Sequence, residues 1–157
     1  MPKVSVILPC YNGSLWISDA VKSVLHKTYD DFELVIVGDG STDNSKSIIS
    51  QHLSDERVHY IYQKNRGFSG AVNRGIKESK GDLIGFIGQD DIWMPNKLEV
   101  QVKYFDAHKD VDLVHSNYCS IDYKGRIIKV RDIKIPSFSA TSPAVKGSAK
   151  EPNRTSR

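Results

Sequence analysis

The sequence predicts an α/β fold, with a Rossmann-like, mostly parallel sheet and helices on both of its faces. Short hydrophobic segments rich in β-branched residues alternate with segments of helical periodicity, and four alternations fit within about 105 residues. One strand segment, residues 32–37 (FELVIV), is almost continuously hydrophobic, which is typical of a strand covered on both faces. Helices between successive strands favour parallel pairing, because a parallel pair needs a long crossover connection.

The strands are predicted from hydrophobic runs bounded by turn residues. The first is residues 3–8 (KVSVIL), ended by Pro9, and the second is the FELVIV segment. Further strands are expected at residues 58–62, 83–87 and 111–116. Residues 121–123 and 126–130 flank Lys124-Gly125 and predict a hairpin.

Four helices are expected between these strands. Residues 14–26 place hydrophobic side chains close to helical spacing, with a polar face between them. Ser41, Thr42 and Asp43 are N-cap residue types and open a second helix that extends to about residue 53. The third covers residues 67–79, and Pro95, at an expected first helical position, opens a fourth that ends near residue 107.

The chain divides by composition into a body and a tail. Residues 1–134 carry the periodic patterns and are predicted to form one domain, whereas residues 135–157 hold mainly Ser, Pro, Ala, Lys, Thr and Gly. Such a segment buries too little hydrophobic surface to offset its ordering entropy, so we predict a disordered or non-native tail. Residues 1–130 hold 16 Lys and Arg against 17 Asp and Glu, so the net charge of +3 comes from the tail. A nucleic-acid-binding function is not expected, because its basic footprint belongs on the folded elements.

Hydrophobic runs, the first residues and the cysteines indicate in which compartment the protein is located. No hydrophobic run is long enough for a transmembrane helix, and the first residues lack the pattern of a signal peptide. The two cysteines, Cys10 and Cys119, form no disulfide scaffold and no metal cluster, so a cytoplasmic protein is expected. Cys10 is interpreted as a small packing residue.

Four polar segments should meet at one edge of the sheet. Ligands of open α/β sheets bind beyond the carboxyl ends of the strands. Residues 9–13, 38–43, 64–70 and 88–91 each follow a predicted strand, so we expect them to surround the functional site.

Asp39 lies between Gly38 and Gly40 at the end of a buried strand. A carboxylate there suits the N–H of a pyrimidine or a ribose hydroxyl, and the glycines allow a ligand to approach closely. The alternative is that Asp39 only caps the following helix.

Asp90 and Asp91 follow another buried strand, after Gly88 and Gln89. Adjacent carboxylates at a sheet edge favour Mg²⁺ or Mn²⁺, which use one or two protein carboxylates with diphosphate oxygens and water. The alternative is a solvated turn at a helix entry.

The remaining two segments offer contacts for a nucleotide. Residues 64–70 (KNRGFSG) precede a helix whose N-terminal N–H groups can face an anion, and Arg66 and Arg74 could add charged contacts to phosphate or be ordinary surface charges. Neither GxxxxGK[ST] nor GxGxxG occurs, so NAD is not indicated. Tyr11 could form an aromatic wall for a base or pack in the core.

Together these segments resemble the nucleotide-sugar-binding half of a family 2 glycosyltransferase with a GT-A fold. The resemblance extends from about residue 4 to residue 130 and rests on five ordered blocks: VSVILPCYNG, FELVIVGDGSTDNS, NRGFSGAVNRGI, KGDLIGFIGQDDIW and MPNKL. It implies inverting transfer of a sugar from a UDP- or TDP-linked donor to a glycan or lipid-linked acceptor, with Mn²⁺ or Mg²⁺ as cofactor. Association of the full-length protein with a membrane surface would fit such an acceptor.

The resemblance also implies roles for individual residues. Pro9 and Tyr11 flank the base, and Asp39 accepts from its N–H. Asn65, Gly67 and Arg74 fall in the block that helps to hold the nucleotide. Asp90 matches the last aspartate of the DxD motif and would ligate the metal.

Two positions depart from the family's pattern. Gly38 replaces the first aspartate of the usual Asp-Asp-Gly-Ser turn, and Gly88 replaces the first aspartate of DxD. A contact to ribose or base is therefore expected to be lost at Gly38, and a contact to ribose at Gly88, where Asp91 is expected to compensate in part as a nucleotide-binding residue.

The catalytic base remains unidentified. In this family it is usually an acidic residue associated with acceptor-binding elements, and no such block follows in this chain, which we therefore expect to be truncated. One alternative function is a nucleotide-sugar-binding module without transferase activity. A receiver-type signalling domain, which shares parallel strands and an acidic pair, is a more distant alternative that metal-dependent UDP binding would exclude.

Overall fold

The computed structural model describes residues 1–122 and 124–131. Contacts divide the chain into two units between Glu99 and Val100. The boundary predicted after residue 134 and the predicted tail lie outside the described residues. Among the described residues, no helix combines the length and hydrophobicity that crossing a membrane requires.

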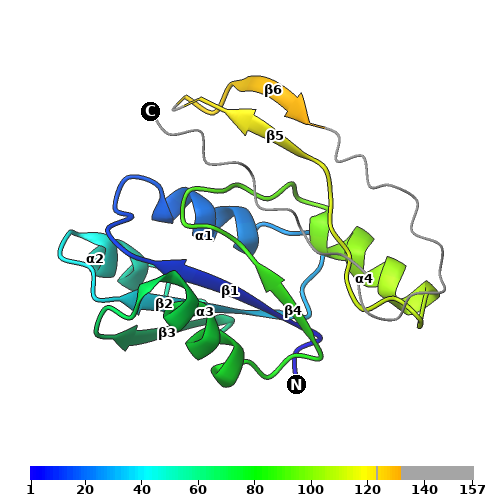
Figure 1. Ribbon diagram of the computed structural model, residues 1–157, viewed down its shortest axis with the longest axis horizontal. Helices are drawn as coiled ribbons and strands as arrows, with labels where there is room; N and C mark the ends of the chain where they lie inside the picture. Colours follow the sequence, from blue (N-terminus) through cyan, green and yellow to red (C-terminus); the bar gives the residue numbers. More distant parts are fainter. Residues whose placement is uncertain (123, 132–157) are drawn as a thin grey trace. The chain divides into compact units, whose positions relative to one another are not determined.

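The first unit is built around a four-stranded parallel sheet of order β3-β2-β1-β4 (Figure 1). Its strands are β1 (Val4–Cys10), β2 (Phe32–Asp39), β3 (Val58–Gln63) and β4 (Leu83–Phe86). Every residue of β1 and β2 is buried. The predicted parallel α/β fold is confirmed, and its central strands are the two with the most continuous hydrophobic runs.

Helices cover both faces of this sheet (Figure 1), and their faces follow from the strand order. The chain moves from β1 to β2 to β3 in one direction, so the right-handed crossovers place α1 (Ile17–Leu25) and α2 (Ser45–Ser50) on the same face. It then returns across the sheet to β4, and α3 (Gly67–Glu78) covers the other face. There Ala71 packs with Val35 and Val37, and Gly75 lies against Ile7.

Pro9 lies inside β1, although the sequence predicted that it ends the strand. β4 pairs with β1 only from Val4 to Ile7, and its last bond runs from the Ile87 N–H to the Ile7 carbonyl. At Pro9 only β2 continues alongside, so the missing N–H of proline falls on the side where no strand pairs.

The predicted helices and strands differ from the observed ones mainly at their ends. α1 begins three residues later than predicted, and α2 ends at Ser50, with turns after it. α4 (Lys97–Ala107) begins after Pro95, whose carbonyl instead accepts from the Thr28 N–H. The strand predicted at residues 111–116 is absent, since these residues have no regular structure and find no pairing strand within the described part of the chain.

The second unit contains the predicted hairpin. β5 (Tyr118–Ile121) pairs antiparallel with β6 (Ile127–Arg131), with an irregularity between Ser120 and Ile121. Gly125 has a φ of 75°, which explains the glycine at this turn.

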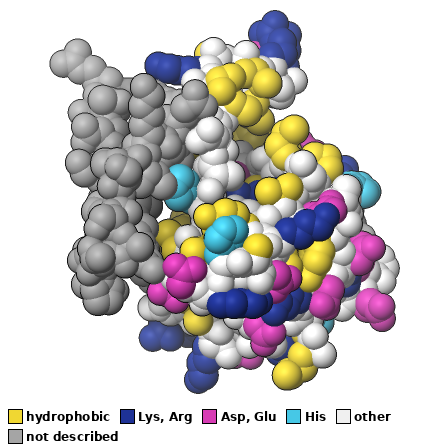
Figure 2. Space-filling view, turned by 90° about the vertical axis from the view of Figure 1, so that its right-hand side faces the viewer, with side chains coloured by type: hydrophobic (Ala, Val, Ile, Leu, Met, Phe, Trp, Pro, Cys, Tyr) yellow, Lys and Arg dark blue, Asp and Glu magenta, His cyan; other side chains and the backbone are white. Residues whose placement is uncertain are grey.

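Charged side chains of both signs are interspersed over the face shown in Figure 2. Lys and Arg do not gather there into one basic stripe. This distribution agrees with the balanced charge of the body of the sequence.

Candidate functional site

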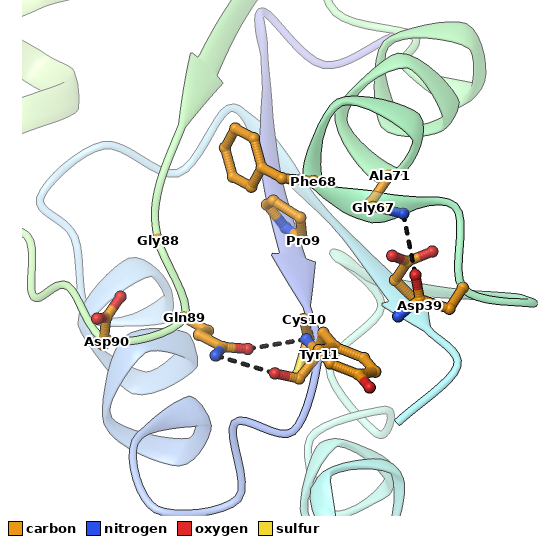
Figure 3. A pocket seen from close by; sticks show the side chains of 11 residues that line it. Pro9, Cys10, Tyr11, Asp39, Gly67, Phe68, Ala71, Gly88, Gln89 and Asp90 are labelled. Atoms are coloured by element: carbon orange, nitrogen blue, oxygen red, sulfur yellow. Dashed lines mark hydrogen bonds between the residues drawn. The ribbon is translucent and has the colours of Figure 1, made fainter. Parts of the chain in front are cut away.

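An open pocket of about 490 Å³ lies beyond the carboxyl ends of the strands (Figure 3). All four segments predicted to meet at this edge contribute to its lining. The sheet order reverses between β1 and β4, and the end of β1 and the segment that follows β4 line the pocket. Its lining residues are Pro9, Cys10, Tyr11, Asp39, Asn65, Gly67, Phe68, Ala71, Gly88, Gln89 and Asp90.

The loop from β1 to α1 is held by side chains of the loop from β2 to α2. Three successive backbone N–H groups donate to it: Asn12 to Ser41 Oγ (3.1 Å), Gly13 to Ser45 Oγ (2.9 Å) and Ser14 to Asp43 Oδ2 (2.9 Å). Asn12 has a φ of 50°, in the left-handed region, and its Oδ1 accepts from the Thr42 N–H at 2.8 Å. The loop that carries Tyr11 is therefore fixed without any ligand.

Asp43, and not Asp39, is hydrogen-bonded to the first residue of α2, whose N-cap is Asn44. Its Oδ1 accepts from the Ser45 N–H at 3.0 Å and from the Ser45 hydroxyl. Burial raises the pKa of the Asp43 carboxyl, but hydrogen bonds from Ser45 and Ser14 outweigh that effect and hold the pKa well below its usual range. The carboxylate thus stays charged where it joins two loops, and the capping alternative for Asp39 is wrong.

Asp39 is buried, with 3% of its surface exposed, at the end of β2. Its Oδ1 accepts from Gln63 Nε2 (2.7 Å) and from the Arg66 N–H (2.8 Å). Gly40 beside it has a φ of 74°, and a Cβ there would lie 2.7 Å from the Asn65 nitrogen. Both hydrogen bonds to Asp39 within the described residues reach Oδ1, so Oδ2 remains an acceptor at the pocket wall.

Tyr11 and Gln89 face each other across the ends of β1 and β4 (Figure 3). Gln89 Oε1 accepts from the Tyr11 N–H at 2.9 Å, and Gln89 Nε2 donates to the Tyr11 carbonyl at 3.2 Å. The Tyr11 side chain is 48% exposed and lines the pocket. The core-packing alternative for Tyr11 is therefore wrong.

Cys10 also lines the pocket but is only 1% exposed. Burial raises the pKa of its thiol. A buried, neutral thiol agrees with the predicted packing role.

The N-terminus of α3 forms one side of the pocket. Gly67, with a φ of 75°, donates its N–H to Asn65 Oδ1 at 3.1 Å. Phe68 and Ala71 follow on the same side, and the positive end of the helix dipole favours a negatively charged ligand there. Arg74 lies further along α3, outside the lining, where its Nε forms an ion pair with Glu78 Oε1 at 3.0 Å.

Asp90 and Asp91 are exposed at the end of the β4 segment. Asp90 lines the pocket, whereas Asp91 lies beside it and Oδ2 of Asp91 accepts from the Gly88 N–H at 3.3 Å. The described residues contain no group of three or more His, Cys, Asp or Glu side chains suited to a metal. Two exposed carboxylates nevertheless fit Mg²⁺ or Mn²⁺, which take most of their remaining oxygens from diphosphate and water.

The family model for glycosyl transferase family 2 matches residues 5–152 of this chain. The chain belongs to glycosyl transferase family 2. It is 38% identical over 137 residues to an uncharacterized glycosyltransferase of Rickettsia bellii, with 87% of this chain and 19% of the relative covered. It is 39% identical over 105 residues to the putative teichuronic acid biosynthesis glycosyltransferase TuaG of Bacillus subtilis, with 66% of this chain and 42% of TuaG covered. The family 2 domain described here therefore spans less than half the length of either relative.

Solved glycosyltransferase structures share the fold. The crystal structure of S. aureus TarS 1-349 in complex with UDP-GlcNAc matches with a TM-score of 0.65 and 26% identity, covering 68% of this chain and 32% of TarS 1-349. The expected GT-A fold is confirmed by this likeness.

The two glycines that depart from the family 2 pattern have different neighbours. A Cβ at Gly38 would lie 2.8 Å from Tyr60 Cζ, so the phenol of Tyr60 fills the space of the missing side chain. A Cβ at Gly88 would lie 2.8 Å from Asp91 Oδ2. At Gly88, then, a carboxylate from three residues along the chain lies where the missing aspartate would begin.

Phe68 and Gln89 lie in segments that the sequence placed at the site, but sequence reasoning gave neither of them an individual role, and it missed Ala71 as a lining residue. Phe68 and Ala71 follow from their positions in the first two turns of α3, once that helix is placed at the pocket. No sequence signal marks Gln89, because its role depends on the distance between two strand ends that are 78 residues apart.

Proposed function

We propose that the pocket binds the nucleotide of a UDP- or TDP-sugar and is the donor site of an inverting glycosyltransferase. The observation that carries this proposal is that one pocket has a carboxylate on each of two sides. A buried acceptor, Asp39, lies on the β2 side, and an exposed carboxylate, Asp90, lies on the β4 side. A nucleoside diphosphate needs both, one for its base and one for a cation on its phosphates.

The base would lie against Tyr11 and Pro9. Tyr11 offers an exposed aromatic face on a loop that hydrogen bonds hold in place. Asp39 Oδ2 would accept from the N–H of the pyrimidine ring, while Oδ1 keeps its bonds to Gln63 and Arg66. Such an acceptor favours uracil or thymine over cytosine, whose ring nitrogen at the same position carries no hydrogen.

The diphosphate would extend from α3 toward Asp90. Asn65 and Gly67 line this side at the positive end of the α3 dipole. Arg74 would have to leave Glu78 to reach the nucleotide, and Asp91 would contact it from beside Gly88. Asp90 would hold Mn²⁺ or Mg²⁺, which supplies Lewis-acid stabilisation of the leaving diphosphate when bound.

A solved relative supports the choice of donor. S. aureus TarS 1-349, with the same fold, was crystallised with UDP-GlcNAc. We propose the same class of donor for this chain, and transfer in the cytoplasm. The proposed acceptor is a glycan or a lipid-linked molecule. A lipid-linked acceptor would suit association of the full-length protein with a membrane surface.

A second candidate is a module that binds the nucleotide sugar without transferring it. The specific observation is that the described lining holds two carboxylates, Asp39 and Asp90, and the proposal above gives both of them, and the adjacent Asp91, donor-side roles. Within the described residues this assignment leaves no pocket carboxylate to deprotonate an acceptor, and a general base typically contributes about 10²- to 10⁴-fold. We therefore expect this chain by itself to bind a donor and hydrolyse it at most slowly.

Calorimetry with UDP, TDP, CDP, ADP and GDP, each with and without Mn²⁺, tests the proposal. UDP or TDP should bind more tightly than the other three, and Mn²⁺ should strengthen the binding. Equal affinity for all five nucleotides would overturn the proposed donor site. Incubation with UDP-sugars and candidate acceptors then separates the two candidates, because acceptor-dependent release of UDP at ordinary enzyme rates would require a base within these 157 residues.

A further inference from the structure

The carboxamide of Gln89 pairs with both backbone polar groups of Tyr11. It accepts from the N–H at 2.9 Å and donates to the carbonyl at 3.2 Å. β4 ends at Phe86, so backbone pairing with β1 has already stopped here. Beyond the last backbone hydrogen bond between β1 and β4, the side chain of Gln89 thus takes over the pairing with the β1 segment, for the single residue Tyr11.

Gly13 gives this carboxamide its room. A Cβ at Gly13 would lie 2.5 Å from Gln89 Oε1 and 2.7 Å from Gln89 Cδ, and every nearest neighbour of that position belongs to Gln89. The Gly13 N–H meanwhile donates to Ser45 Oγ at 2.9 Å. The loop around Tyr11 is therefore fixed by Ser41, Asp43 and Ser45 from one side and by Gln89 from the other.

We infer that Gln89 is a positioning residue that sets the orientation of Tyr11 for the nucleobase. The inference rests on the proposed donor site and adds a residue to it. Gln89 touches the backbone of Tyr11, and its amide supplies one donor and one acceptor in the geometry that a strand would supply. Asp90 is the next residue in the sequence, and we assign it to the phosphate side of the pocket. Gln89 instead contacts Tyr11, which we assign to the base side.

A loss of Gln89 should consequently weaken binding of the base more than binding of the phosphates. Gln89→Ala should lower the affinity for uridine roughly three- to tenfold, which is the effect of about one neutral hydrogen bond. The affinity for inorganic pyrophosphate with Mn²⁺ should stay within about twofold of the original, since Tyr11 does not contact that ligand. A role in general stability alone would reduce both affinities together.

The experiment measures both ligands by NMR titration or calorimetry for the unchanged chain, Gln89→Ala, Gln89→Glu and the control Gln51→Ala. Gln51 is exposed at the end of α2, outside the pocket. Gln89→Glu keeps the length of the side chain but places a carboxylate against the Tyr11 carbonyl, so its uridine affinity should fall at least as far. Amide exchange of Tyr11 should become faster in Gln89→Ala, which removes the acceptor of its N–H, and thermal unfolding checks that each variant folds.

Gly13→Ala provides an independent route that leaves Gln89 in the sequence. The new Cβ should displace the flexible carboxamide and lower uridine affinity to a similar extent. In a Gln89→Ala background the same substitution should have little further effect, because the atoms that it displaces are gone. This double-mutant cycle keeps the test valid if one Gln89 variant folds poorly.

The outcomes separate the inference from the proposed function. Failure of the unchanged chain to bind uridine or UDP would overturn the proposed function and this inference with it. If the unchanged chain binds and Gln89→Ala binds uridine equally well, only the inference is overturned. Parallel loss of uridine and pyrophosphate binding would also overturn it, since Gln89 would then support the whole pocket and not the base side.

Discussion

The phenol ring of Tyr60 lies against Gly38, so that a Cβ at position 38 would stand 2.8 Å from Tyr60 Cζ. Tyr60 is partly buried on the edge strand β3, and its Cε2 and Cζ both crowd this position, so the rigid phenol would have to move as a whole. Gly38→Ala should therefore destabilise the fold by about 1–3 kcal/mol, as is typical of overpacking. In a Tyr60→Ala background the same change should cost much less, and urea unfolding of the four chains measures this coupling.

Asp39→Ala should weaken UDP binding. A hydrogen bond to a charged acceptor contributes about 1.5–3 kcal/mol, or about 10- to 150-fold in affinity. Because Asp39 also accepts from Gln63 and Arg66, Gln63→Ala is the matched control, which removes one structural hydrogen bond and keeps the carboxylate. Calorimetry that gives both variants the same UDP affinity would return Asp39 to a structural role.

Asp90→Asn should abolish the effect of Mn²⁺ on UDP affinity and leave the fold intact. The side chain is exposed, so neutralising it removes a metal ligand without disturbing the core. Asp19→Asn, an exposed aspartate of α1 outside the pocket, is the control and should keep the full Mn²⁺ effect. An unchanged Mn²⁺ effect in Asp90→Asn would contradict the assignment.

Lys27 should make stability rise with pH between about 8 and 10.5. Its Nζ donates to the carbonyls of Trp93 (2.6 Å) and Met94 (2.8 Å), and burial, aided by the charge of Lys97, lowers the pKa of Lys27 to about 8. Above that pH the folded chain loses the proton while the unfolded chain keeps it until near 10.5, so the unfolded state binds more protons and the free energy of unfolding increases. The gain is at most about 3.5 kcal/mol, since the pKa falls from 10.5 to about 8 and one pKa unit corresponds to about 1.4 kcal/mol.

Urea unfolding at pH 7.5 and 9.5 measures this effect. The unchanged chain should gain stability relative to Lys27→Met as the pH rises, whereas Lys22→Met, on the exposed side of α1, should follow the unchanged chain. A stability difference between the unchanged chain and Lys27→Met that stays constant with pH would contradict the prediction.

The sequence was sufficient for the fold and for the place of the site, because both depend on hydrophobic periodicity and on where strands end. It failed where a residue's role is decided by a neighbour distant in sequence. Asp39 and Asp43 are acidic residues four positions apart at the end of the same strand, and only the positions of Ser14 and Arg66 show that Asp43 joins two loops while Asp39 lines the pocket. The missing strand at residues 111–116 has the same origin, since a strand also requires a partner.

Pro9 determines where the backbone pairing of β1 with β4 ends beside the pocket. In the parallel register of β1 and β4, the next hydrogen bond after that of Ile87 to Ile7 would run from the N–H of residue 9 to the Ile87 carbonyl. Proline has no such hydrogen, so backbone pairing between the two strands stops there, and beyond it, within the described residues, only the side chain of Gln89 joins the two segments, through Tyr11. At this wall of the pocket the limit of the sheet is thus set by a covalent ring in the backbone, and a change of side chains elsewhere cannot extend it.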